Sequence, residues 1–298
     1  MNEEVHKPIE EQVIVVFGAS SGIGRATALE ASRRGATVVA VGRDKPALES
    51  LLQESNATKM AIQIADAADL RQVEDVAHFT SSTFGRIDTW AHVAGVAAYG
   101  RFEDMQPDEF RRVIEVDLFG PVWGARAALP ELRRSHGALV VVSSEIAKRA
   151  FPLVTSYSAA KHGVDGFLEA LRVELRHDHA GVSVTQIMPA AVGTPFFEHA
   201  RTRLGVRPSG PPPVYSPEKV AEAILRAAEK GGRDIPVGGA ARMQIAMQRM
   251  SPRAMDFLSR AAFRLQRSKE PKAPGDDALF DAPSGDDRTS GVVSNAHR

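Results

Sequence analysis

The chain has 298 residues, 43% of them hydrophobic, which is enough for one large or two small domains with a sizeable core. Its 37 basic and 37 acidic residues leave no net charge, so there is no bulk electrostatic case for a nucleic-acid partner. The absence of cysteine excludes disulfides, thiolate zinc sites and cysteine nucleophiles, and we expect no bound metal.

The N-terminal stretch MNEEVHKPIEEQ is acidic and has no apolar core, which argues against a signal peptide. No apolar run reaches the roughly 18 residues that a transmembrane helix needs. We therefore expect a soluble, cytoplasmic protein.

Short β-branched runs alternate with longer segments of helical periodicity. The strand-like runs cover 13–17, 36–42, 60–66, part of 87–95, 137–144, 181–189 and 233–238. Helical patterns cover 22–35, a segment capped by Asp44, 69–85, 107–135 with a perturbation near Pro121, 156–179 and 216–231. This alternation predicts an α/β fold, in which a doubly wound parallel sheet of about seven strands carries helices on both faces.

The first strand is followed directly by the turn GASSGIG, which contains Gly18, Gly22 and Gly24. Glycines at such a turn let the backbone approach a pyrophosphate, and the helix that follows favours negative charge at its N-terminus. On this evidence alone, a purely structural turn is about as good an explanation.

The stretch TSYSAAKHG places Tyr157 four residues before Lys161. On a helix this spacing puts both side chains on one face, where an ammonium favours the phenolate and lowers the tyrosine pKa. When the pair is taken alone, a packed tyrosine beside a solvated lysine is the better explanation.

Together these motifs resemble the short-chain dehydrogenase/reductase family over about residues 10–240. The glycine turn has the family's spacing, Ser144 lies thirteen residues before Tyr157, and MPAAVGTPF resembles the family's Pro-Gly motif, with Ala190 in place of the glycine. The resemblance implies a Rossmann-like fold and hydride transfer between a nicotinamide and an alcohol or carbonyl. It further implies that Tyr157 is the general acid or base, that Ser144 positions the carbonyl oxygen, and that Lys161 lowers the Tyr157 pKa and holds the ribose.

The resemblance also implies a set of cofactor-binding residues, and the end of the second strand indicates which nucleotide they bind. Gly42 stands where NAD-preferring members carry aspartate, and Arg43 stands where NADP-preferring members carry a basic residue, so we expect NADP(H) rather than NAD(H). The alternative is a surface Arg43 with Asp44 in the acidic role. The expected cofactor-binding residues are Gly18, Ser20, Ser21, Gly22, Ile23, Gly24, Arg43, Asp66, Ala94, Gly95, Tyr157, Lys161, Pro189 and Thr194.

Two stretches depart from the family pattern. Asp117 stands in EVDLFG where the family has a catalytic asparagine, and we retain it as a fourth catalytic residue. In AHVAG, His92 and Val93 replace two asparagines, and we expect His92 to be a structural histidine that supplies one polar partner. These changes leave open a second hypothesis, that the protein is a nucleotide-binding sensor or scaffold without catalytic turnover.

The sequence predicts four parts: an N-terminal tail at 1–10, the catalytic domain at 11–240, a helical extension at 241–267 and a disordered tail at 268–298. The extension is basic, apolar and interrupted at Pro252. Its helices pack on this domain or on a partner subunit, or they form a peripheral membrane or partner contact. The long, Pro-rich loop at 190–216 is expected to be a lid, a binding loop or a disordered segment.

The substrate pocket is expected outside the carboxyl ends of the strands. Its candidate walls are 145–155, 96–102 and 190–216, which carry Ile146, Phe151, Leu153, Phe196 and Phe197. These side chains favour a hydrophobic carbonyl or alcohol as substrate. Family members often assemble as homodimers or homotetramers through helices near 107–135 and 156–179, which the resemblance suggests here.

Overall fold

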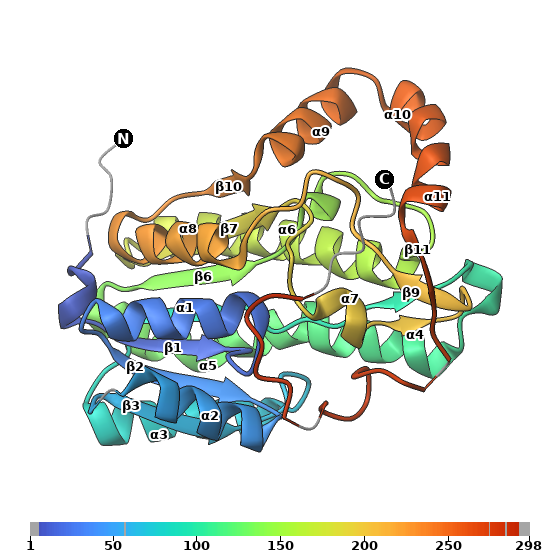
Figure 1. Ribbon diagram of the computed structural model, residues 1–298. Coiled ribbons are helices and arrows are strands. Elements are labelled where there is room, and N and C mark those ends of the chain that lie inside the picture. The colour runs from blue at the N-terminus through green and yellow to red at the C-terminus, as the bar shows by residue number, and fades with distance from the viewer. Residues whose placement is uncertain (1–5, 57, 274, 284, 292–298) are drawn as a thin grey trace.

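A computed structural model describes residues 6–56, 58–273, 275–283 and 285–291 (Figure 1). Its centre is a seven-stranded parallel sheet in the order β10-β7-β6-β4-β1-β2-β3, which confirms the predicted fold class. The strands are β1 (Val13–Phe17), β2 (Thr37–Gly42), β3 (Met60–Ile64), β4 (Thr89–His92), β6 (Ala138–Val142), β7 (Ser183–Pro189) and β10 (Asp234–Val237).

The central strands are buried on both faces, which explains why they read as unbroken apolar runs rather than alternating ones. Every residue of β1, β4, β6 and β7 is buried. The strand order changes direction beside β1, which pairs with both β2 and β4. Crevices at such a switch point, outside the carboxyl ends of the strands, bind ligands in open α/β sheets.

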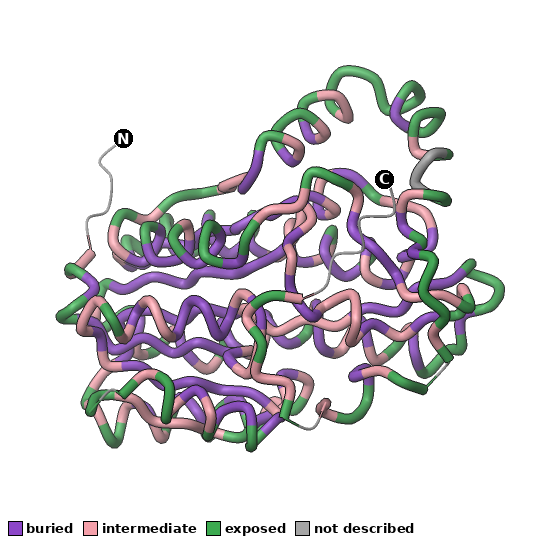
Figure 2. Tube along the Cα trace, in the orientation of Figure 1, coloured by how far each residue is buried: buried purple, intermediate pink, exposed green. Residues whose placement is uncertain are grey.

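Helices form a layer on each side of the sheet (Figure 1). One layer contains α1 (Gly22–Arg33), α2 (Lys45–Ser55) and α8 (Pro217–Lys230), which bury apolar side chains against β1, β2 and β6. The other contains α3 (Leu70–Phe84), α4 (Pro107–Ile114), α5 (Gly120–Ser135) and α6 (Thr155–His177). Figure 2 shows the buried residues concentrated in the sheet between these layers.

The predicted perturbation near Pro121 takes the form of one π-helical turn, η3 (Glu115–Phe119), between α4 and α5. Such turns interrupt the i to i−4 hydrogen bonds and are frequent at functional sites. This one carries Asp117, which is fully buried.

The 190–216 loop contains three short elements, α7 (Phe196–His199), β8 (Arg201–Thr202) and β9 (Val206–Pro208). β8 pairs with β5 (Ala98–Tyr99), and β9 pairs with β11 (Arg267–Pro271). Short 3₁₀ turns occur at Ile9–Glu11, Phe102–Asp104, Glu145–Ala147 and Ser259–Ala261.

The extension at 241–267 is helical, as expected, and consists of α9 (Gly239–Met250), α10 (Pro252–Leu258) and α11 (Ala262–Leu265). It projects from one end of the molecule and is largely exposed (Figures 1 and 2). Within the described residues, no helix is long and apolar enough to cross a membrane.

The chain after residue 267 differs from the expected disordered tail. Residues 267–271 form β11, because β9 offers them a strand edge, and the described residues 275–283 and 285–291 run back across the catalytic domain (Figure 1). We call these two stretches the C-terminal segment. Residues 292–298, and residues 1–5 of the predicted N-terminal tail, lie outside the described residues.

Candidate active site

The glycine turn brings three pieces of backbone too close together for side chains. A Cβ at Gly24 would lie 1.9 Å from the Gly18 carbonyl oxygen, and one at Gly18 would lie 2.5 Å from the Ala94 nitrogen. Gly18 and Gly22 also have positive φ angles of 102° and 55°. The turn therefore presents bare backbone at the N-terminus of α1, as the phosphates of a dinucleotide require.

Ser144, Tyr157 and Lys161 meet at the carboxyl end of β6. Ser144 lies two residues beyond the end of that strand, while Tyr157 and Lys161 lie one turn apart at the start of α6. The Lys161 Nζ lies 5.2 Å from the centroid of the Tyr157 ring, and the Ser144 and Tyr157 hydroxyls are hydrogen-bonded. The structure therefore brings the predicted trio together in one place, where all three residues line the same cavity.

Asp117 forms a buried ion pair with Lys161 on the side of the lysine that faces away from the cavity. Its Oδ2 lies 3.1 Å from the Lys161 Nζ, and its Oδ1 accepts a hydrogen bond of 2.8 Å from the Val96 amide. Burial raises the pKa of Asp117, while the Lys161 ammonium opposes that rise. Asp117 has no exposed surface and does not line the cavity described below, so it acts on the site through two cavity-lining residues that it contacts, Lys161 and the Val96 backbone.

The electrostatics of Tyr157 differ from the sequence expectation. Burial raises the pKa of Tyr157 well above its ordinary value, and the charges of Asp117 and Tyr99 raise it further, while the hydrogen bond with Ser144 lowers it. Burial is the largest cause of this rise and outweighs the lowering that we expect from the Lys161 ammonium, and the Asp117 carboxylate, which the family pattern lacks, acts in the same direction as burial. Tyr157 is therefore held in its protonated form.

A single cavity of about 270 Å³ adjoins both the glycine turn and this trio. It is lined by Ser144 and by all the residues that we expect to bind the cofactor: Gly18, Ser20, Ser21, Gly22, Ile23, Gly24, Arg43, Asp66, Ala94, Gly95, Tyr157, Lys161, Pro189 and Thr194. The residues present thus fit a nicotinamide dinucleotide, and their individual roles stay predictions.

Arg43, Asp44 and Asp66 lie together at the far end of the cavity. The Asp44 side chain is buried, and its Oδ1 caps α2 by accepting a hydrogen bond of 3.1 Å from the Ala47 amide. The Asp66 carboxylate pairs with Arg112 and lies 3.9 Å from the Arg43 Nη1. The Arg112 contact escaped sequence analysis because it joins positions 46 residues apart.

His92 is fully buried, and its ring stacks on Phe17 at 5.3 Å. Burial, aided by the Lys161 charge, lowers the pKa of His92 to about 3, so the ring stays neutral. Neither ring nitrogen has a hydrogen-bond partner among the described residues. His92 is thus a packing residue, and the expectation that it supplies a polar partner is wrong.

The end of the cavity beyond Tyr157 is apolar. Phe196 packs on the Tyr157 ring at 5.8 Å and on Phe197 at 5.6 Å, and Ile146 and Phe151 complete this wall. Leu153 is buried in the packing behind it rather than at the cavity surface.

Sequence analysis missed two polar groups in this wall, Tyr99 and Glu145. Burial raises the pKa of both, that of Glu145 from 4.5 to about 7. Glu145 is 4% exposed and its Oε2 has no partner within the described residues. Its position directly after Ser144, in a stretch that was already a candidate wall, is the signal that could have revealed it.

Comparisons with known proteins agree with this geometry. A family model described as short chain dehydrogenase matches residues 12–205. The chain belongs to the short-chain dehydrogenase family. Within it, the chain is 37% identical to an uncharacterized oxidoreductase of Bacillus subtilis, YxnA, over 94% of this chain and 80% of that protein.

Two further relatives bear on chemistry. A 3-dehydrosphinganine reductase of Danio rerio is 30% identical over 73% of this chain and 68% of that protein. An alcohol dehydrogenase of Thermococcus sibiricus, solved in complex with 5-hydroxy-NADP, is 25% identical, has a TM-score of 0.65 and covers 76% of this chain and 94% of its own. The chain is therefore similar to oxidoreductases.

Proposed function

We propose that this oxidoreductase transfers a hydride between NADP(H) and a hydrophobic carbonyl or alcohol. The observation that carries the proposal is the convergence of Ser144, Tyr157 and Lys161 on a cavity that has bare glycine backbone at one end and an apolar wall at the other. The intact trio also disfavours the alternative of a nucleotide-binding sensor or scaffold without turnover.

The nicotinamide, when bound, supplies or accepts the hydride. Tyr157 donates its hydroxyl proton to the carbonyl oxygen during reduction, and its raised pKa keeps that proton in place until the oxygen becomes basic. Ser144 donates a hydrogen bond to the same oxygen and orients it. Lys161 holds the ribose, and Asp117 fixes Lys161 from behind.

The preference for NADP(H) rests on the positions of Arg43 and Asp44. Arg43 lines the cavity, and its planar guanidinium suits a phosphate. The Asp44 carboxylate caps α2 with Oδ1, while its Oδ2 accepts from the Gly285 amide. Capping leaves at most Oδ2 for the ribose hydroxyls, which disfavours the alternative in which Asp44 takes the acidic role. The related alcohol dehydrogenase in complex with 5-hydroxy-NADP supports the same choice.

The substrate class rests on the apolar wall of Ile146, Phe151, Phe196 and Phe197. The similarity to a 3-dehydrosphinganine reductase supports a substrate with hydrocarbon character. A panel of long-chain and aromatic ketones, run with NADPH against phosphorylated sugars as controls, tests this proposal. We expect turnover only with the apolar carbonyls, and preferential turnover of the sugar phosphates would refute the substrate class.

A second proposal concerns the exposed face of α9–α10, which we assign to an anionic lipid surface. Met250 and Phe257 are 85% and 66% exposed there, among several arginines. The inner face is already covered, because Arg149 donates to the Met255 carbonyl at 2.8 Å. Co-sedimentation with anionic vesicles should be lost in Met250→Glu/Phe257→Glu, and equal sedimentation of both proteins would refute the assignment.

Assembly into a homodimer or homotetramer through α4, α5 and α6 remains a proposal, as does a cytoplasmic location. Val173, which is 65% exposed on α6, offers a probe of assembly. Sedimentation equilibrium should show that Val173→Glu weakens self-association, and a monomeric wild-type protein would refute the proposal.

A further inference from the structure

The C-terminal segment lies along the full length of the groove that we assign to NADP(H). Residues 278–280 lie at Arg43, Arg288 lies at Gly22, and Gly291 lies at Thr194. The first two places are those that we propose for the 2′-phosphate, at Arg43, and for the pyrophosphate, at the glycine turn, and Thr194 is a further proposed cofactor-binding residue. Figure 1 shows this stretch, in dark red, crossing the molecule in front of α1.

The contacts use the polar groups that the cofactor would need. The Arg43 guanidinium donates hydrogen bonds of 2.7 Å to the carbonyls of Ala278 and Phe280. The Gly22 amide, at the N-terminus of α1, donates to the Arg288 carbonyl at 2.9 Å. A backbone carbonyl and a phosphate oxygen cannot both occupy either position, so these contacts and cofactor binding exclude one another.

The segment also carries acidic side chains close to the groove. Burial lowers the Arg43 pKa, an effect that the carboxylates of Asp66 and, to a smaller extent, Asp281 oppose. The Asp287 carboxylate accepts from the Ser50 hydroxyl on α2 at 2.6 Å. Ala278, Ala282 and Pro283 form part of the cavity wall.

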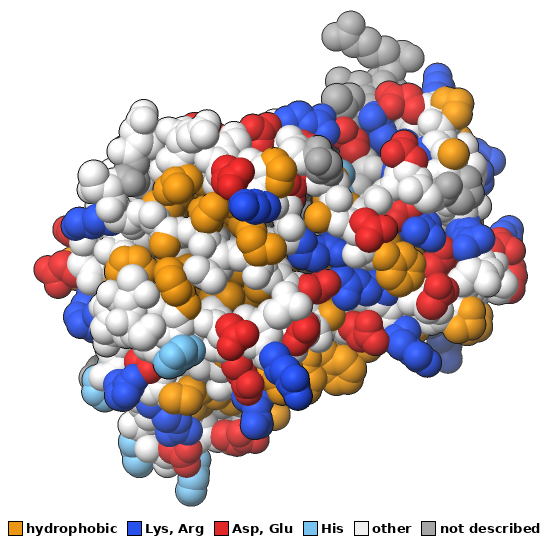
Figure 3. Space-filling model, turned by 90° about the horizontal axis from the view of Figure 1, so that it is seen from below, with side chains coloured by type: hydrophobic (Ala, Val, Ile, Leu, Met, Phe, Trp, Pro, Cys, Tyr) orange, Lys and Arg blue, Asp and Glu red, His pale blue; other side chains and the backbone are white. Residues whose placement is uncertain are grey.

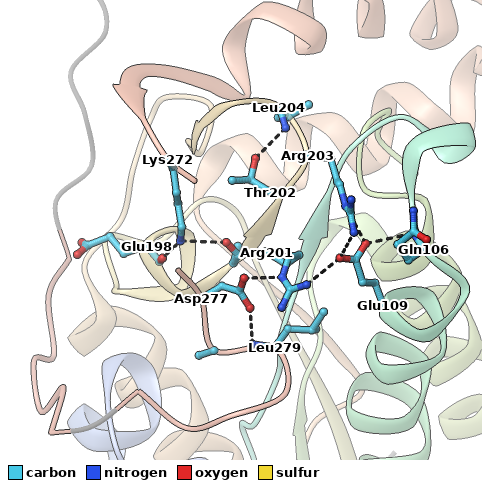
Figure 4. Close-up of polar contacts among 12 residues, drawn as sticks. Gln106, Glu109, Glu198, Arg201, Thr202, Arg203, Leu204, Lys272, Asp277 and Leu279 are labelled. Carbon is cyan, nitrogen blue, oxygen red and sulfur yellow. Dashed lines mark hydrogen bonds and ion pairs between the residues drawn. The ribbon is translucent and has the colours of Figure 1, made fainter. Parts of the chain in front are cut away.

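Charged anchors hold the segment in this position. At its start, the Asp277 carboxylate pairs with Arg201, which also contacts Glu109 on α4 at 2.9 Å (Figure 4). Further along, the Asp286 carboxylate pairs with His199 at 2.7 Å, and the Arg288 guanidinium pairs with Glu198 at 2.8 Å. The second group of anchors belongs to α7, outside the residues that we assign to the cofactor.

We propose that the C-terminal segment is an internal competitor of NADP(H), which must leave the groove before the cofactor's phosphates can bind. This inference rests on the proposed function, because it takes the groove to be the cofactor site. When only a fraction of the molecules is competent to bind, the apparent dissociation constant equals the intrinsic one divided by that fraction. Loosening the anchors on α7 should therefore tighten cofactor binding.

The test is the equilibrium dissociation constant of NADPH, measured by fluorescence titration of full-length proteins. Asp286→Asn/Arg288→Ala removes both anchors and leaves every proposed cofactor-binding residue in place. We expect its dissociation constant to fall about threefold or more. Arg253→Ala, an exposed arginine on α10, serves as the matched control and should bind like the wild type.

Amide hydrogen exchange of the wild-type protein gives a second measurement. The Gly285 amide is bonded to Asp44 at 2.8 Å and the Gly291 amide to the Gly193 carbonyl at 3.1 Å, so saturating NADPH should accelerate exchange across 285–291. Unchanged or weaker binding in the double variant, or protection of 285–291 by NADPH, would overturn the inference while leaving the proposed function intact. A failure of all three proteins to bind NADPH would overturn both.

Discussion

The nucleotide end of the cavity is formed mainly by backbone, whereas the substrate end is formed mainly by side chains. The nucleotide end consists of the glycine turn between β1 and α1, and of the residues at the carboxyl ends of β2 and β4 that lie against it. The substrate end and the outer wall consist of side chains from the 145–155 stretch, α7 and the C-terminal segment. The first end is determined by local spacing, whereas the second depends on contacts between distant parts of the chain.

The largest effect should come from the point where the two ends meet. Tyr157→Phe removes the proton donor and should lower turnover by about 10²–10⁴-fold, while NADPH affinity stays within about twofold. Tyr215→Phe is the matched control, because its hydroxyl contacts only the Ala240 amide, at 3.3 Å, in the described structure. Wild-type turnover in Tyr157→Phe would show that the trio is not catalytic.

The nucleotide end should tolerate no added side chain. Gly24→Ala places a Cβ 1.9 Å from the Gly18 carbonyl and should cost about 1–3 kcal/mol of unfolding free energy, together with NADPH binding. Gly166→Ala, on α6 with open space around it, should instead stabilise the fold by about 0.5–1 kcal/mol. Urea denaturation measures both, and equal effects would contradict the close approach at the turn.

The substrate end should respond to pH through Glu145. Because its folded-state pKa is raised from 4.5 to about 7, the stability it contributes is complete below pH 4.5 and declines as pH rises to about 7. Glu145→Gln should therefore be more stable than the wild type above pH 7, by up to about 3 kcal/mol, and similar to it near pH 4. Thermal unfolding at both pH values, with exposed Glu103→Gln as control, checks this, and a difference independent of pH would contradict it.

The smallest effect should be a shift in the pH profile caused by Asp117. Removing its charge in Asp117→Asn lowers the Tyr157 pKa, since Asp117 raises it. Reduction needs protonated Tyr157, so the alkaline decline of kcat/KM should begin at lower pH in the variant. An unchanged or upward shift would show that Asp117 does not act on Tyr157 through its charge.

The sequence predicted the sheet, the glycine turn and the trio because each depends on spacing within one segment or on the order of strand ends. It did not predict the pKa of Tyr157, because the balance between burial, Lys161 and Asp117 depends on where η3 is placed. The C-terminal segment was missed for a related reason. Its Pro, Gly and Asp content indicates disorder, whereas its anchors, Arg201 among them, are recognisable only once the fold brings them together (Figure 4).

The charge pattern of the surface was also predictable only in part. Zero net charge predicts no dominant sign, and the face in Figure 3 indeed shows acidic and basic side chains interspersed around a hydrophobic area. The sequence shows that arginines and apolar residues are concentrated on α9–α10. That several of these apolar side chains are exposed is known only from the structure.

The central claim is that this groove binds NADP(H) through Arg43. Fluorescence titration of the wild type and of Arg43→Ala with NADPH and NADH tests it most directly. We predict tighter binding of NADPH than NADH in the wild type, and loss of that preference in Arg43→Ala with little change for NADH. Equal or tighter binding of NADH by the wild type would contradict the account.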